Sequence, residues 1–318
     1  MNKFKKIGLT ALAGSLVATS AFAAEWTISG GASIGVSNIT GSADGSTGKD
    51  WSMGNQMNFS GSGELDNGMS VTVAFELDQG AGAGVDSTTD SGKPFDNHSI
   101  TIASDTFGTL VMSGHGGSSA HSAMATMASG DVWNQTIGVT GMVDAASGDD
   151  SLFYTLPEVM DGVKIDLSMS PGRAAQETHT SYAVTYTGIE GLSLSFGRGD
   201  SGAPGAVAEH TAMKGSYAFG PVTIAASSHE DDNSGATADI DGTSYSVAYT
   251  ISDELSVSYG TDTFDKTGTS VDQEVEGITV SYTAGGMTIS ASQYEATGGG
   301  YVAGAKTDKW SLGASFAF

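Results

Sequence analysis

Cysteine is absent from the 318 residues, and proline (five) and basic side chains (12, against 36 acidic ones) are scarce. Without cysteine an exported chain has no disulfide framework, so its stability must come from extensive pairing and packing. The few prolines beside 46 glycines argue against a proline-rich linker or a collagen-like chain. The shortage of basic residues argues against a nucleic-acid partner, because binding nucleic acid requires a basic face.

The chain also lacks an apolar run of 18 residues, so no transmembrane helix is expected. Its start has the three parts of a secretory signal peptide: Lys3, Lys5 and Lys6, a short apolar run over 7–18, and the small-residue site Ala21-Phe22-Ala23. We therefore predict a cleaved signal peptide at 1–23 and a mature domain at 24–318. The mature domain keeps nine basic against 36 acidic residues, a formal charge of −27.

Apolar and polar residues alternate in sixteen segments of the mature chain. Examples are Val71, Val73 and Phe75 early in the chain, and Leu312 and Phe316 at its end. A period of two over this many segments predicts β-strands, each with one apolar face. The opposite face is polar, as in Gln56, Asn58, Ser60, Ser62 and Glu64.

The connections between these segments alternate strictly between seven short turns and eight long loops. In an up-and-down meander, all short turns then lie at one end and all long loops at the other. Together with the signal peptide, this asymmetry predicts an outer-membrane barrel of sixteen antiparallel transmembrane strands, closed because unpaired strand edges cannot face hydrocarbon. Five aromatic residues fall at strand ends on the apolar face, where interfacial girdles belong: Tyr186, Tyr249, Tyr282, Trp310 and Phe318. The alternative is a soluble secreted β-sandwich or solenoid.

One connection, residues 113–150, is much longer than the others and has no alternation of its own. Loops of this length inside a compact domain are usually functional or disordered. Its middle carries apolar residues at three- and four-residue spacing, which predicts a short helix: Ala120, Ala123, Met124, Met127 and Ala128. We interpret this stretch as a constriction loop folded into the barrel, with a surface loop as the alternative.

Three motifs carry a resemblance to a known family. They are Asp105-Thr106-Phe107-Gly108-Thr109-Leu110 leading to Gly114, Ser151-Leu152-Phe153-Tyr154 after the long loop, and the alternating end from Trp310 to Phe318. In their order and spacing, the mature chain resembles a Gram-negative trimeric general porin of the alphaproteobacterial type. The resemblance implies a homotrimer among outer-membrane lipid and lipopolysaccharide. One position departs from the family pattern: where the family often has arginine after the glycine that opens the loop, this chain has His115.

A porin constriction places loop acids opposite wall bases. The candidate acids are Asp131, Asp144, Asp149 and Asp150, and the candidate bases are His115, Lys164, Arg198 and Lys214. Arg198 shares the parity of the apolar Leu194 and Phe196, so it must snorkel or lie at a bulge to reach the lumen. Because the mature chain has a formal charge of −27 and the loop has four aspartates but no lysine or arginine, we predict a water-filled, weakly cation-preferring channel for ions and small hydrophilic solutes, with a substrate-selective porin as the alternative.

Two further interpretations concern chemistry. No cofactor is required, but Asp149-Asp150 and Asp231-Asp232 are candidate calcium ligands, since carboxylate oxygens suit calcium and similar porins often hold it. A barrel hydrolase is the less favoured alternative and would use His210, His229 and Asp231. The G-x-S-x-G match at 31–35 lies inside a strand pattern with no following helix, so it does not predict a nucleophile elbow. We therefore expect no enzyme activity.

Overall fold

The computed structural model describes residues 25–41, 47–78, 95–135, 138–139, 141–142, 145, 149–172, 177–203, 206–234 and 238–318. The predicted signal peptide lies outside these residues. Among them, no helix is both long and apolar enough to cross a membrane.

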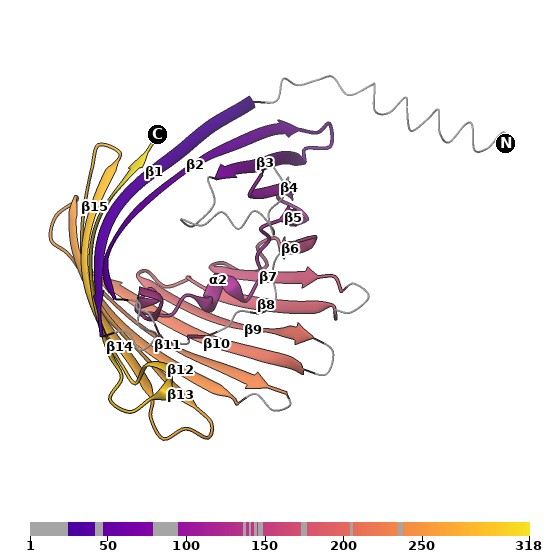
Figure 1. The fold of residues 1–318 in the computed structure, drawn as a ribbon. Coiled ribbons are helices and arrows are strands. Elements are labelled where there is room, and N and C mark those ends of the chain that lie inside the picture. The colour runs from indigo at the N-terminus through magenta and orange to yellow at the C-terminus, as the bar shows by residue number, and fades with distance from the viewer. Residues whose placement is uncertain are drawn as a thin grey trace, which may run out of the picture.

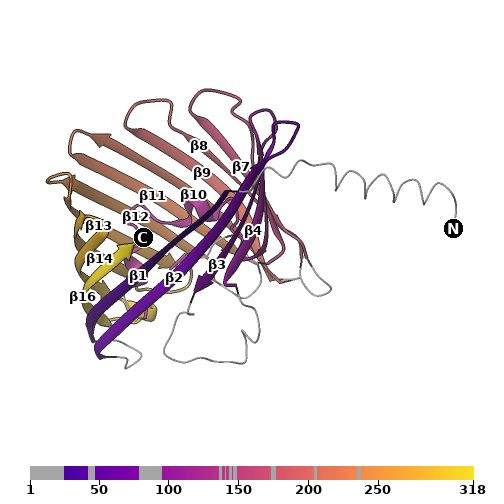
Figure 2. The same cartoon turned by 90° about the horizontal axis from the view of Figure 1, so that it is seen from above.

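The sixteen predicted strands are present and form one closed antiparallel barrel (Figure 1). In chain order they are β1 (Glu25–Thr40), β2 (Gly48–Glu64), β3 (Ser70–Asp78), β4 (Asn97–Ser104), β5 (Gly108–His115), β6 (Ser151–Thr155), β7 (Val163–Ser170), β8 (His179–Tyr186), β9 (Leu192–Ala203), β10 (Ala206–Phe219), β11 (Val222–Asn233), β12 (Ile240–Thr250), β13 (Leu255–Lys266), β14 (Gln273–Ala284), β15 (Met287–Thr297) and β16 (Lys306–Ala317). Each strand pairs with its neighbours in sequence, and β1 pairs with β16 to close the ring. Figure 2 shows the tilt of the strands.

The seam between β1 and β16 is closed by backbone hydrogen bonds at the last residue. The N–H of Gly30 donates to the carbonyl of Phe318 (2.7 Å), and the N–H of Phe318 donates to the carbonyl of Gly30 (3.0 Å). No strand edge is therefore left open at this seam, as a sheet in hydrocarbon requires.

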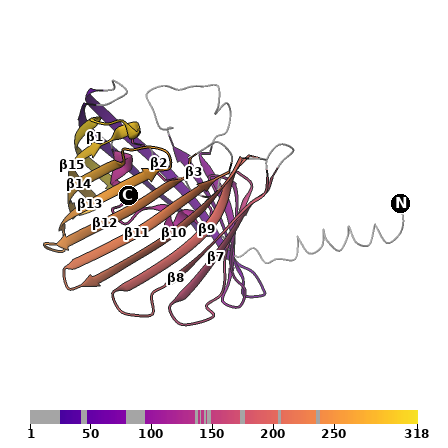
Figure 3. The ribbon, with the colours of Figure 1, turned by 90° about the horizontal axis from the view of Figure 1, so that it is seen from below.

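The apolar side chains of the strands point outward from the wall. Figure 3 shows the strands that form this wall from below. Large side chains such as Trp26, Met53 and Tyr245 are more than half exposed on this outer face. Small polar side chains take the inner face. The barrel is one closed sheet, so it has no core between two packed sheets. The buried apolar clusters lie instead between the long loop and the inner wall.

Several strands extend beyond the ends that the apolar pattern predicts. From the apolar alternation alone, the sequence predicts long connections near 38–50, 230–243 and 262–273. In the structure β1 continues to Thr40, β11 to Asn233 and β13 to Lys266. In this outer part, polar residues of β11 stay paired in register with β12, as Glu230 does with Asp241. Backbone pairing continues where the apolar alternation has stopped, because the ladder requires no lipid-facing side chains.

Candidate functional site

The long loop lies inside the barrel along the inner wall of β7 to β15. Its short helix α2 (Ser122–Ala125) is drawn within the ring of strands beside β8 to β10 (Figure 1), and a 3₁₀ turn, η1 (Val132–Gln135), follows. The predicted helix is present but only four residues long. It stays short because the loop backbone on either side bonds to the wall instead of to itself.

The wall holds the loop backbone with one polar side chain after another from successive strands. The N–H groups of the loop donate to side-chain oxygens in five places: Ala120 to Ser168 (2.9 Å), His121 to Ser181 (3.2 Å), Ala128 to Ser227 (2.9 Å), Ser129 to Ser244 (2.8 Å) and Trp133 to Asp262 (3.1 Å). The acceptors come from β7, β8, β11, β12 and β13. These inward serines and Asp262 therefore satisfy loop amides that have no partner in a helix or sheet.

Apolar packing adds to this polar contact. Met124 packs with Ala120, Ala183 and Ala212, while the Trp133 ring meets Phe264 edge to face, with ring centroids 6.1 Å apart. Close approach depends on glycine at Gly260, where an added Cβ would lie 2.7 Å from the Cβ of Ser129. These contacts place the loop against one side of the lumen, so the passage is confined to the other side.

The two ends of the loop meet through an ion-pair contact between His115 Nδ1 and Asp149 Oδ1. Asp149 and Asp150 are both exposed there. The structure thus brings together three of the predicted constriction residues at the root of the loop. Asp144 lies outside the described residues.

Asp131, within the loop, and Lys214, on β10, both form hydrogen bonds to the loop backbone. The carboxylate of Asp131 accepts a hydrogen bond from the N–H of Met127 (2.7 Å), and Asp131 takes a left-handed backbone conformation (φ 57°). Burial raises the pKa of Asp131. Lys214 donates to the carbonyl of Thr126 (2.8 Å). Both side chains therefore help to hold the loop in place, in addition to any effect they have on passing ions.

Within the described residues, Lys164 and Arg198 pair with other residues of the wall and not with the loop. Lys164 is the second residue of β7 and pairs with Asp166 (2.8 Å). Arg198 lies on the outer face and pairs with Glu209 of β10 (2.5 Å). Its neighbours Gly197 and Gly199 face the loop, because a Cβ added there would meet Met124 and Ala145 respectively. Arg198 therefore keeps the outward orientation that it shares with Leu194 and Phe196, and no bulge turns it toward the lumen.

Next to the root of the loop lies an acidic group that sequence reasoning did not single out. Carboxylate oxygens of Glu76, Asp78 and Asp96 lie within 4.8 Å of one another, and Asn97 donates to Glu76 (3.2 Å). A recess of about 180 Å³ at this place includes Glu76, Asn97 and His115. Glu76 and Asp78 alternate with the outward Phe75 and Leu77, so this alternation could have identified them as inward-facing residues.

Lys309 was missed in the same way. It alternates with the outward Trp310, lies on the inner face of β16 and is paired in register with Tyr294. Its parity in the sequence was the available signal.

The predicted calcium ligands on β11 do not converge. Asp231 is buried and hydrogen-bonded to His210, whereas Asp232 is exposed. Successive residues of a strand face opposite sides of the sheet, so this pair cannot share one ion. Calcium binding stays a prediction for Asp149 and Asp150.

A serine, a histidine and an aspartate form a hydrogen-bonded chain on β9, β10 and β11. Ser201 Oγ lies 2.6 Å from His210 Nε2, and His210 Nδ1 lies 2.7 Å from Asp231 Oδ1. These are triad distances. However, the ring of His210 is only 1 % exposed, so a substrate cannot reach the base. The chain of bonds satisfies buried polar groups in the wall.

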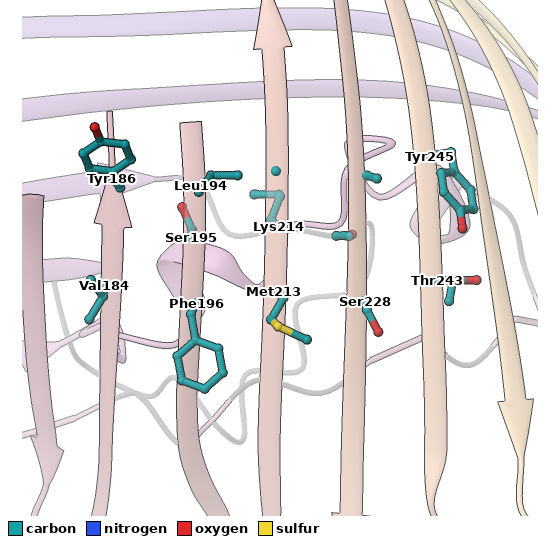
Figure 4. Close-up of a pocket in the computed structure, with 13 residues that line it drawn as sticks. Val184, Tyr186, Leu194, Ser195, Phe196, Met213, Lys214, Ser228, Thr243 and Tyr245 are labelled. Carbon is teal, nitrogen blue, oxygen red and sulfur yellow. The ribbon is translucent and has the colours of Figure 1, made fainter. Parts of the chain in front are cut away.

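A larger hollow, of about 770 Å³, lies on the outer face of β8 to β12 (Figure 4). Phe196, Met213 and Tyr245 project into it from neighbouring strands, and small residues such as Gly215 form its floor. Because these apolar side chains point away from the lumen, the hollow belongs to the membrane-facing surface and not to the channel.

Comparison with known proteins agrees with this architecture. The family model of Gram-negative porins matches residues 8–318. No curated protein sequence matches the chain.

Three solved structures illustrate the similarity. The anion-selective porin from Comamonas acidovorans is 13% identical with a TM-score of 0.72, covering 93% of this chain and 100% of that one. OmpT of Vibrio cholerae, an outer membrane protein, is 14% identical with a TM-score of 0.68, covering 94% and 99%. A mutant of the Rh. blastica porin is 15% identical with a TM-score of 0.66, covering 92% and 100%. At these identities the likeness shows the fold alone.

The family match spans nearly the whole chain, and the closed sixteen-stranded barrel with an inserted loop agrees with it. Members of this family are channels and not enzymes, which is consistent with the inaccessible serine–histidine–aspartate chain. The protein therefore belongs to the Gram-negative porins, the channel-forming β-barrels of the outer membrane.

Proposed function

We propose that the protein is a general diffusion porin with a weak preference for cations. The observation that carries this proposal is the charge distribution around the loop root. Asp149 and Asp150 are exposed there, and the carboxylates of Glu76, Asp78 and Asp96 gather nearby, with His115 as the neighbouring base. A narrow passage between low-dielectric walls makes such charges strongly felt by a passing ion.

The inner wall carries few basic side chains to set against this charge. Among the residues that the structure describes, Lys164 pairs with Asp166, Lys214 bonds to the loop, and Lys266 lies over the ring of Tyr301 (5.3 Å). Lys309 is the fourth inward lysine. No dense basic wall of the kind described for the family therefore faces the loop in the described part of the barrel.

Planar-bilayer recording of the reversal potential in a potassium chloride gradient tests the proposal. We expect a reversal potential of the sign for potassium permeation, with ohmic conductance for small ions. The similar Comamonas acidovorans porin is anion-selective. An anion preference in this chain would contradict the charge argument and would point to Lys309 and Lys214 as the dominant groups. Saturable transport of one solute would favour the substrate-selective alternative.

We also propose a homotrimer of the alphaproteobacterial type, in contact with membrane lipid and lipopolysaccharide. The outer face over β3 to β6 has a hollow of about 600 Å³ bordered by apolar residues including Val73, Ile100 and Met112, which a neighbouring copy can fill. Chemical cross-linking in detergent should yield a three-chain product. A purely monomeric protein would contradict this part of the proposal.

A further inference from the structure

We propose that the apolar belt around the barrel is uneven, and that the protein thins the lipid bilayer beside β9, β10 and β11. This inference concerns the membrane around the barrel, goes beyond the proposed function and does not depend on the ion preference of the channel. It starts from the height of the apolar face on each strand, measured from the end at the short turns. An outer-membrane barrel typically presents an outward apolar band about 25 Å tall.

The first strand carries a tall band. The ring of Phe318 covers Gly30 on the outer face of β1, since a Cβ added there would lie 3.0 Å from that ring. With a rise of about 3.3 Å per residue and a strand tilt of about 40°, the step from Trp26 to Val36 spans about 25 Å across the membrane. The apolar side chains of this band are Trp26, Ile28, Ala32, Ile34 and Val36.

The ninth strand carries a much shorter band. Its outward apolar side chains are Leu192, Leu194 and Phe196, and Arg198 takes the next outward position. The same geometry gives only about 10 Å from Leu192 to Phe196, and about 15 Å from Leu192 to Arg198. Hydrocarbon as tall as the band of β1 would therefore enclose Arg198.

The polar edge continues in register across the neighbouring strands. Arg198 is paired with Thr211 on β10, and Thr211 is paired with Glu230 on β11. Two residues further toward the long loops, Glu209 on β10 is paired with Asp232 on β11. Both of these carboxylates and that of Glu230 are exposed on the outer face. The low edge is therefore a property of three adjacent strands and not of one residue.

Side-chain reach and barrel tilt do not remove the mismatch. The guanidinium of Arg198 can reach toward the long loops, where it pairs with Glu209 (2.5 Å), but Thr211 and Glu230 have shorter side chains. Tilting the whole barrel raises one side and lowers the other without changing the height of either band. A bilayer beside a short apolar surface adapts by thinning.

The charges of this face fit lipid headgroups and water better than a protein cover. Among the residues that the structure describes, no base pairs with Glu230 or Asp232. A protein packed over them would bury carboxylates without a partner, which is costly. Headgroups and water drawn down to this row keep them hydrated.

Spin labels measure the depth of the polar row directly. Because the chain has no cysteine, Thr211→Cys can place one label in this row without breaking the pair of Arg198 and Glu209, and Tyr217→Cys can place one lower on the same face of β10. In vesicles of dimyristoyl phosphatidylcholine, oxygen collides with labels in hydrocarbon and a soluble nickel chelate collides with labels at the water. We expect oxygen to reach the label at position 217 and the nickel chelate to reach the label at position 211.

Thermal unfolding in vesicles with progressively longer saturated chains tests the same mismatch. Arg198→Leu, Thr211→Leu and Glu230→Leu together extend the short band by one row, about 5 Å. The most stabilising chain length should then be greater than for the wild type. The matched control is Asn38→Leu, which extends the tall band of β1 and should leave the optimum unchanged.

Three results would overturn the inference. Equal oxygen access at positions 211 and 217 would mean that hydrocarbon covers the polar row at full height. A label at position 211 shielded from both reagents would mean that protein covers it. An unchanged optimum in the folded triple variant would mean that this row does not set the height of the bilayer. If the triple variant does not fold, the two labels decide. The reversal potential tests ion preference separately, so failure of either idea leaves the other standing.

Discussion

The backbone N–H of Trp133 donates a hydrogen bond to the carboxylate of Asp262, which is completely buried in the wall of the barrel (3.1 Å). This contact holds η1 on β13, far along the loop from His121. The described hydrogen bonds from the loop backbone to the wall thus run from Ser168 at one end to the carboxylate of Asp262 at the other.

Asp262→Ala should loosen this part of the loop. Removal of a buried acceptor leaves the amide of Trp133 without this bond, at a cost of about 2 kcal/mol. We expect noisier single-channel currents and a lower thermal stability of the barrel in detergent. Ser256→Ala, on the same strand at the end away from Trp133, is the matched control. Equal noise in both variants would argue against Asp262 as an anchor.

The carboxylates at the loop root should control ion preference. Asp149→Asn combined with Asp150→Asn should lower the ratio of potassium to chloride permeability by about twofold, since each charge acts within a confined passage. Glu230→Gln with Asp232→Asn is the control, because both side chains are exposed near the end of β11 and lie on the face opposite to buried Asp231. At physiological salt their effect is screened within about 8 Å. A control that shifts the reversal potential as strongly would refute the assignment.

Asp131→Asn should stabilise the protein at neutral pH. The raised pKa of Asp131 means that the folded state binds its proton more tightly than the unfolded state, so this group lowers stability as pH rises through that window. Asparagine keeps the acceptor for Met127 and tolerates the left-handed backbone. Thermal unfolding should show the variant more stable than wild type at pH 7, with the difference vanishing near pH 3. A difference that persists at pH 3 would indicate another cause.

Arg198→Ala should leave the channel unchanged. The exposed pair with Glu209 on the outer face contributes less than about 1 kcal/mol, and the side chain does not reach the lumen. Lys214 lies on the neighbouring strand β10 and faces the lumen. Lys214→Met removes the hydrogen bond to Thr126 and should disturb the open-channel current. Bilayer recordings of the two variants distinguish outer from inner placement. A selectivity change in Arg198→Ala would place that residue in the pore.

The strands, their number and their outward faces could be predicted from sequence because lipid selects apolar side chains at every second position, as at Val71 and Val73. The acidic group of Glu76, Asp78 and Asp96 could not be predicted in this way. Glu76 and Asp78 lie at the end of one strand, whereas Asp96 comes after a long connection in the sequence. The roles of Asp131 and Lys214 were equally hidden: parity places Lys214 inward, but only the path of the loop shows that it contacts Thr126. Strand ends such as Asn233 were misplaced because backbone pairing outlasts the apolar signal.

The seam between Gly30 and Phe318 has a consequence for assembly. Every other strand can pair with a neighbour that precedes it in synthesis, but the free edge of β1 must wait for β16. Contacts between such distant parts of a chain form slowly. The first strand therefore keeps an unpaired edge through most of folding, and this edge is a template for pairing with other chains until β16 is in place.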